Sequence, residues 1–284
     1  MSVSLEDVST QGLATSPAHS EAMRTAERRL RRRRSWLVFL GRLLLLVVAC
    51  LLWWAVGALG WLSTFYISSP AEVAQAIVTA FTVDGFGEDL MSTLFATFVG
   101  FAVGALLGIL VGLGLGVLPP YINAVVDPFI MALNSLPRIA LAPLFIVFFG
   151  LDELSKIAVS ITLVFFVLLI SARSGILNVN PDLLHLVSAM RLTRAQLFTK
   201  LMFPAALPSI FAGLTIGMTY SLLGVVSAEI IASKRGVGVL IQQYSGTFNM
   251  AGTYAVLIVL AIVAALINEL MLQAQRAALR WQTV

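Results

Sequence analysis

The feature that most constrains the fold of this sequence is a series of apolar runs, each near or above the roughly 20 residues that an α-helix needs to cross a bilayer. Glycine, proline and short polar segments separate the runs. They fall at residues 36–58, 90–118, 124–150, 155–177, 204–231 and 250–275. Because 59% of the residues are hydrophobic and only 11% are charged, a water-soluble core does not account for the chain. The sequence therefore predicts an all-α integral membrane protein of about six transmembrane helices.

The domain organisation follows from a change of composition near residue 35. Residues 1–35 are rich in Ser, Thr, Ala, Glu and Arg and poor in aliphatic side chains, so we predict a disordered basic cytoplasmic tail. Residues 36–284 are predicted to form one transmembrane domain. The arginine cluster at 24–34 could bind nucleic acid or anionic lipid, but directly before a membrane span it indicates topology. We expect no nucleic-acid partner.

The distribution of Lys and Arg predicts the orientation of the chain. Most Lys and Arg side chains lie at the ends of the apolar runs that share one side of the predicted membrane, and only Lys156, Lys234 and Arg235 lie on the other side. The 59–89 loop carries acidic residues and no Lys or Arg. By the positive-inside rule, both termini and residues 178–203 are expected in the cytoplasm and the 59–89 loop outside.

A glycine repeat marks the second apolar run. Its members are Gly100, Gly104, Gly108, Gly112 and Gly116. On a helix of 3.6 residues per turn, a spacing of four places them on one slowly drifting face without side chains. The repeat predicts close packing against another helix, either within the subunit or between subunits.

The sequence lacks the motifs of hydrolytic and metal-dependent enzymes. It contains no G-x-x-x-x-G-K-[ST], G-x-S-x-G or H-E-x-x-H segment. Its single cysteine, Cys50, lies in an apolar run, and His19 and His185 do not have metal-ligand spacing. We therefore expect no catalytic residues, no metal site and no ATPase activity of this chain.

Polar side chains inside apolar runs are costly in a bilayer and mark either a pathway or a buried pair. Asn134 and Arg138 flank Pro137 in the third run, and Glu229 lies near the outer end of the fifth. Two prolines break the third run and free backbone carbonyls, which is tolerated only against protein or a water-filled cavity. We predict Asn134, Arg138 and Glu229 as residues of a translocation pathway, with structural pairing as the alternative. Asp127, followed by a proline, is interpreted as a helix N-cap, with a functional role as the alternative.

Residues 178–203 are too polar to span the membrane and are predicted to form a helical hairpin. An asparagine N-cap precedes Pro181, which should begin the first helix. Thr193 and Gln196 match a capping box for a second helix that ends near Phe203.

This hairpin carries more apolar side chains than a solvated loop needs, which favours docking to a soluble partner. The alternative is a pair of helices on the membrane surface. The predicted contact residues are Leu183, Leu186, Val187, Arg191, Thr193 and Arg194.

Residues 178–213 resemble the cytoplasmic coupling loop of type I ABC importer permeases, and the resemblance extends over most of the chain after Trp61. The segments that carry it are Ile67–Pro70, Asn134–Leu144 with Phe149–Gly150, and Ala228–Glu229 followed by Gly236–Ile241. Together they are similar to the nitrate, sulfonate and taurine branch. The loop departs from the family at His185–Val187 and Arg191, where members usually carry a Glu-Ala-Ala-like triplet and a glycine.

The resemblance implies a type I permease-like fold in the inner membrane, with the hairpin as the site of coupling to the ATPase. It implies two permease subunits, either two copies or two paralogues, two ATPase subunits that bind ATP and Mg, and an extracytoplasmic binding protein. This chain would bind no cofactor and would form the pathway for a small organic or inorganic anion or a vitamin-like precursor. The alternative is an ion-gradient-driven secondary transporter or channel, but the halves show no inverted repeat and few buried acids suited to ion coupling.

Overall fold

The computed structural model describes residues 17–60, 64–82, 85–183, 190 and 192–280, and it divides into two compact units, 1–64 and 65–284. The first unit contains a single long helix, α1 (Pro17–Ala58), whose apolar part is Trp36–Ala58. The described part of the predicted disordered tail, 17–35, is therefore helical. Ala, Arg, Glu and Met, which dominate this stretch, are good helix formers, and the helix extends from the span into it without interruption.

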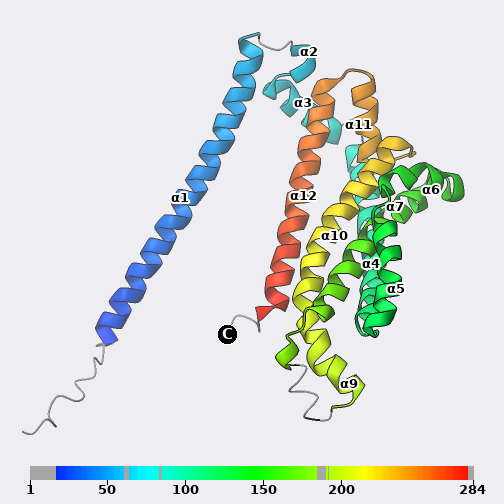
Figure 1. The fold of residues 1–284 in the computed structure, drawn as a ribbon. Coiled ribbons are helices and arrows are strands. Elements are labelled where there is room, and N and C mark those ends of the chain that lie inside the picture. The colour runs from blue at the N-terminus through cyan, green and yellow to red at the C-terminus, as the bar shows by residue number, and fades with distance from the viewer. Residues whose placement is uncertain (1–16, 61–63, 83–84, 184–189, 191, 281–284) are drawn as a thin grey trace, which may run out of the picture. The chain divides into compact units, whose positions relative to one another are not determined.

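The second unit consists of helices in its described part (Figure 1). They are α2 (Thr64–Ile67), α3 (Pro70–Thr82), α4 (Phe86–Gly116), α5 (Pro120–Asn134), a 3₁₀ turn (Arg138–Leu141), α6 (Ala142–Phe149), α7 (Glu153–Leu177), α9 (Arg194–Leu197), a π-helical turn (Phe198–Met202), α10 (Phe203–Ile231), α11 (Val237–Gly246) and α12 (Met250–Ala278). Over the described residues of both units, five helices are long and apolar enough to cross a membrane, and six spans result if α5 and α6 count as one broken span. The prediction of an all-α membrane protein of about six spans is confirmed.

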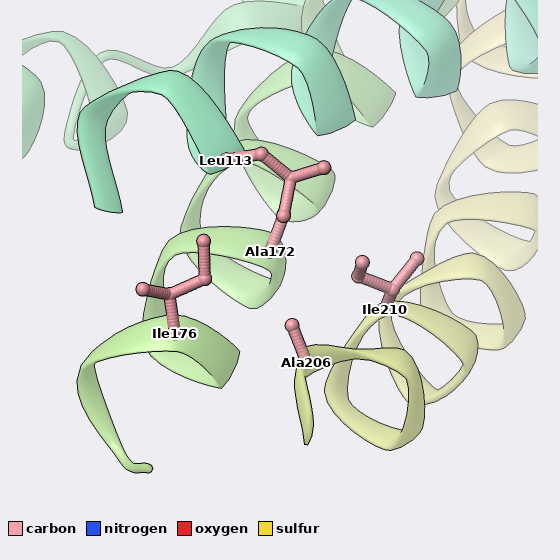
Figure 2. Close-up of a cluster of buried hydrophobic side chains, with 5 residues drawn as sticks. All are labelled: Leu113, Ala172, Ile176, Ala206 and Ile210. Carbon is pink, nitrogen blue, oxygen red and sulfur yellow. The ribbon is translucent and has the colours of Figure 1, made fainter. Parts of the chain in front are cut away.

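The core of the second unit lies where α4, α7 and α10 meet. Figure 2 shows one layer of it, in which side chains from the three helices point toward one another. These are Leu113, Ala172, Ile176, Ala206 and Ile210. Small alanines beside branched side chains let the three backbones approach closely, as van der Waals packing in a membrane requires.

The glycine repeat forms the contact between α4 and α7 within the subunit. A methyl group added at Gly108 would lie 2.4 Å from the Phe165 carbonyl oxygen, and one at Gly112 would lie 2.5 Å from that of Leu169. Gly114, outside the repeat, has open space where a side chain would stand. The prediction of close helix packing is confirmed, and of its two alternatives the structure shows the one within the subunit.

The third span is broken. The axes of the segments Pro120–Ser135 and Arg138–Phe149 differ by 74°, so the single run predicted at 124–150 is a bent pair. Pro137 supplies no N–H and precedes a short 3₁₀ turn that leads into α6. α5 buries one residue, Asn123, and thus contributes little to the apolar core of its own subunit.

The predicted second helix of the cytoplasmic hairpin does not end near Phe203. It starts as α9, passes through the π-helical turn and continues into α10 without a break, giving one rod over Arg194–Ile231. Pro204 stands at the first turn of α10, but the π-turn re-pairs the backbone around it, so the proline does not end the helix.

Short helices cover one end of the spans, the end that the charge distribution predicts to lie outside. α3 and α11 pack with α4 and α12 through an apolar cluster that includes Phe86 and Val237. At the start of α3, the Ser69 N–H donates to Glu72 and the Glu72 N–H donates to the Ser69 hydroxyl. The Ser68 hydroxyl also donates to this carboxylate, and these bonds hold the pKa of Glu72 below its ordinary value.

Candidate functional site

Polar side chains gather at three levels along α4, α5, α7 and α10. One cluster lies near the start of α7 and the end of α10, one at the break between α5 and α6, and one near the end of α7. A polar group is expensive inside a bilayer unless it is paired or lines a cavity, so each cluster is a candidate for a structural or transport role.

The first cluster lies at the predicted outer end of the spans, is called the outer cluster, and is built on the ion pair between Lys156 of α7 and Glu229 of α10. Their side chains are 1% and 0% exposed, and Nζ lies 3.2 Å from Oε1. The Thr93 hydroxyl and the Gly238 N–H also donate to the Glu229 carboxylate, each at a donor–acceptor distance of 2.9 Å. A buried charge is tolerated when its remaining hydrogen-bonding capacity is filled, and this carboxylate meets that condition.

The ammonium group of Lys156 shares its three donors among Glu229 and three further acceptors. Nζ donates to the Ser92 hydroxyl at 2.8 Å, to Glu153 at 3.0 Å and to the Arg235 carbonyl at 3.2 Å. The ammonium group therefore ties the segment that leads into α11 to the core helices.

Glycine is required where this segment crosses the buried carboxylate. Gly236 has φ +130°, a conformation that other residues rarely adopt, and a methyl group there would lie 2.1 Å from Glu229 Oε1. The Gly236 N–H donates to Asp89 and the Val237 N–H donates to Thr93, both at 2.9 Å. The glycines of the Gly236–Ile241 segment thus let the backbone close over the ion pair.

The middle cluster joins the two sides of the broken span. Arg138 Nη2 donates to the Asn134 carbonyl oxygen at 2.8 Å and to its side-chain oxygen at 2.5 Å. The guanidinium also lies over the Phe166 ring of α7, 4.4 Å from its centroid. Arg138 thereby caps the C-terminal end of α5, where a cation is favourable.

The residues around this break have little cover from the described residues of the second unit. Asn134, Ser135 and Leu136 are exposed and Arg138 is half-buried. On α6, Val147 is 81% exposed. Irregular backbone at membrane depth must be covered by protein or line water, so this face borders a partner or an aqueous pathway.

The third cluster, called the inner cluster because it lies toward the predicted cytoplasmic end, pairs α5 with α7. Arg173 forms an ion pair with Asp127 and donates to the Asn123 side chain at 3.2 Å, and Asn123 donates to the Leu118 carbonyl at 3.0 Å. Asp127 lies inside α5, so its interpretation as an N-cap is wrong. Pro128 follows it within the helix, and the carboxylate pairs with a cation from another span.

Residues 104–281 match the family described as the binding-protein-dependent transport system inner membrane component. The chain belongs to this family. It is 30% identical over 241 residues to the taurine transport system permease protein TauC of Escherichia coli, covering 83% of this chain and 87% of that protein. It is 29% identical over 246 residues to the putative aliphatic sulfonates transport permease protein SsuC of Bacillus subtilis, covering 84% and 87%.

A solved structure shares the fold. An inward-facing form of the MetNI methionine ABC transporter superposes with a TM-score of 0.60 at 23% identity, over 67% of this chain and 94% of that one. The chain is therefore a type I ABC importer permease of the sulfonate, taurine and nitrate branch, and a multi-pass protein of the inner membrane. Its family works with an ATPase and a substrate-binding protein.

The 178–203 loop, the predicted coupling loop of the permease, is described in part. Thr193 and Gln196 form the predicted capping box, with 3.0 and 3.3 Å hydrogen bonds in the two directions. Arg194 and Leu183 are exposed, the latter to 44%. Leu186, Val187 and Arg191 lie outside the described residues. A cavity of about 1020 Å³ opens beside this loop, between the C-terminal end of α4 and the rod that starts at Arg194.

The structure brings together two of the three predicted pathway residues. Asn134 and Arg138 are in direct contact, whereas Glu229 lies in the outer cluster with Lys156 and Thr93. Sequence reasoning had treated Lys156 only as an exception to the charge asymmetry. Its position as the second residue of the apolar run 155–177 was the available signal that it needs a buried partner.

Proposed function

We propose that the permease pairs with a second permease, either another copy or a paralogue, and that the pathway for a small anion or vitamin-like precursor runs past the α5–α6 break. The observation that carries this proposal is the exposed break at Asn134 and Arg138, because it needs cover that the described residues of the second unit do not supply. Both termini lie in the cytoplasm in this arrangement, and ATP and Mg²⁺ bind to the partner ATPase.

The relatives support the substrate class. TauC is named for taurine and SsuC for aliphatic sulfonates, and ThiX of Halalkalibacterium halodurans, 30% identical over 145 residues, for formylaminopyrimidine. All three names denote small polar molecules, and two denote sulfonates. A small organic anion is the substrate class that these names and the Arg138 cation favour together.

The coupling contact is proposed at the 178–203 loop. Its described part carries a rigid capped turn at Thr193 and an exposed cation at Arg194, and Leu183, Leu186, Val187 and Arg191 complete the predicted contact. Apolar anchors ringed by basic side chains suit the centre and the rim of a protein interface.

The test of the proposal is purification of the tagged chain with its partners and reconstitution in vesicles. We expect an ATPase subunit to copurify, and ATP-driven uptake of taurine or of an alkanesulfonate to require the binding protein. Leu186→Asp should abolish ATPase copurification or substrate-stimulated hydrolysis, because it places an unpaired charge in the contact, whereas Leu186→Met should leave both intact. Uptake driven by an ion gradient without nucleotide would overturn the proposal in favour of a secondary transporter.

A further inference from the structure

We propose that Arg138 and Asn134 form an anion-binding point within the permease, where the guanidinium holds a sulfonate or carboxylate group as it passes the break in the third span. This inference rests on the proposed function, since it assigns a chemical role to the surface along which that function places the pathway.

The hydrogen bonds of Arg138 leave part of its donor set unused. A guanidinium carries five N–H donors in a fixed fork, and the described residues accept hydrogen bonds only from Nη2. Nη1 has no hydrogen-bond partner among these residues, and Nε is buried without one. The unused Nη1 group lies on a half-buried side chain at an exposed break, so it is the part of the fork that an oxyanion can reach.

Arg138 also differs from the other cations of the polar clusters because it lacks a carboxylate counter-charge. Lys156 pairs with two carboxylates and Arg173 with one, whereas Arg138 has no carboxylate partner in the described part of the chain. A cation at membrane depth without a counter-charge is expensive. An anionic substrate supplies the missing charge for as long as it is bound.

The orientation of the guanidinium is held from two sides. Phe166 of α7 stacks against its face, and the Asn134 oxygens accept from one edge. Residues of α5 and α7 thus converge on one fork, and a guanidinium with a fixed plane discriminates oxyanions better than a mobile one.

The competing explanation is that Arg138 only caps α5. A cap satisfies the carbonyl of Asn134 and needs no ligand. The two explanations differ in what they predict for a neighbouring residue: an anion bound at Arg138 shields the adjacent surface from a reagent, whereas a cap does not.

The experiment uses the full complex with Cys50→Ala and Ser135→Cys, which places one thiol at the exposed break. The rate of its reaction with the uncharged methyl methanethiosulfonate is measured with methanesulfonate, or with dimethyl sulfone as the uncharged molecule of the same shape. We expect methanesulfonate to slow the reaction at least about threefold and dimethyl sulfone to have no effect. Arg138→Gln should remove the protection, and Arg138→Lys, which keeps the charge but not the fork, should weaken it.

Equal protection by both compounds, or protection that survives Arg138→Gln, would overturn the anion site and leave Arg138 as a cap. Copurification of the ATPase and binding-protein-stimulated hydrolysis are measured on the same Ser135→Cys complex. If these persist without protection by methanesulfonate, the anion site fails and the proposed function stands.

Discussion

The buried Lys156–Glu229 pair allows the sharpest test of how the outer ends of the spans are held together. Lys156→Met removes the ammonium group but keeps a side chain of similar length. Glu229 would then be a fully buried carboxylate that keeps its bonds from Thr93 and Gly238 but has lost its counter-charge. The Arg235 carbonyl and the Ser92 hydroxyl would lose their donor in the same step.

The cost of this change follows from burial. Removing one partner of a buried ion pair costs about 3–5 kcal/mol, because the other charge remains without compensation. At about 2–4 °C per kcal/mol for a domain of this size, the apparent melting temperature should fall by roughly 6–20 °C. The double variant Glu229→Gln with Lys156→Met should be less destabilised than the sum of the two single variants by about 1–3 kcal/mol, because it leaves no fully buried charge unpaired, and Glu153, which also loses Lys156, is 37% exposed.

The assay is thermal unfolding of the purified permease in detergent, followed by tryptophan fluorescence at one fixed heating rate. Lys234→Met is the matched control, because its pair with Asp152 joins side chains that are 63% and 66% exposed. An exposed pair contributes about 0–1 kcal/mol, so this control should melt close to the parent protein. If Lys156→Met melts with the control, or if the double variant is simply additive, the outer cluster does not hold the helices together as argued.

Three further outcomes are expected. Gly108→Leu should prevent stable folding, because its Cβ would lie 2.4 Å from a carbonyl oxygen of α7. Gly114→Ala, the control, should give the same yield of purified protein as the parent chain, because nothing lies within 4 Å of its Cβ. Glu72 should titrate below an ordinary glutamate in ¹³C NMR spectra. Its hydrogen bonds therefore stabilise the start of α3 fully above the ordinary glutamate pKa and lose this effect as the pH falls through the lowered value, and an unshifted titration would contradict the capping geometry. With the native cysteine replaced, an impermeant thiol reagent should reach Thr247→Cys from outside and Thr199→Cys only from the cytoplasm, and labelling of both from one side would refute the orientation.

Features that depend on local pattern could be predicted from the sequence. The apolar runs give the spans, because length and composition alone decide whether a helix can cross a bilayer. The spacing of four residues between Gly108 and the other glycines of the repeat predicts a helix face without side chains. The Thr193 capping box likewise involves two residues only three positions apart. In each case the cause lies within one helix.

Features that depend on which helices meet could not be predicted in this way. Lys156 and Glu229 are 73 positions apart, and only the arrangement of α7 beside α10 makes them partners. Asp127 has a local explanation as a cap, but its pairing with Arg173 depends on where α5 lies against α7. The π-helical turn at 198–202 was missed because a proline at the start of a helix normally marks a boundary, whereas an extra residue in the turn carries the helix past it.

The unbroken helix over Arg194–Ile231 has a mechanical consequence. Its 38 residues extend about 57 Å at 1.5 Å per residue, whereas the hydrocarbon core of a bilayer is about 30 Å thick. Nearly half of its length therefore stands outside the hydrocarbon. The exposed Arg194 lies at one end of this rod and the buried Glu229 near the other. If the proposed ATPase contact acts on the Arg194 end, a push there would tilt the whole rod, and the displacement at the Glu229 end would depend on where along its length the neighbouring helices act as the fulcrum.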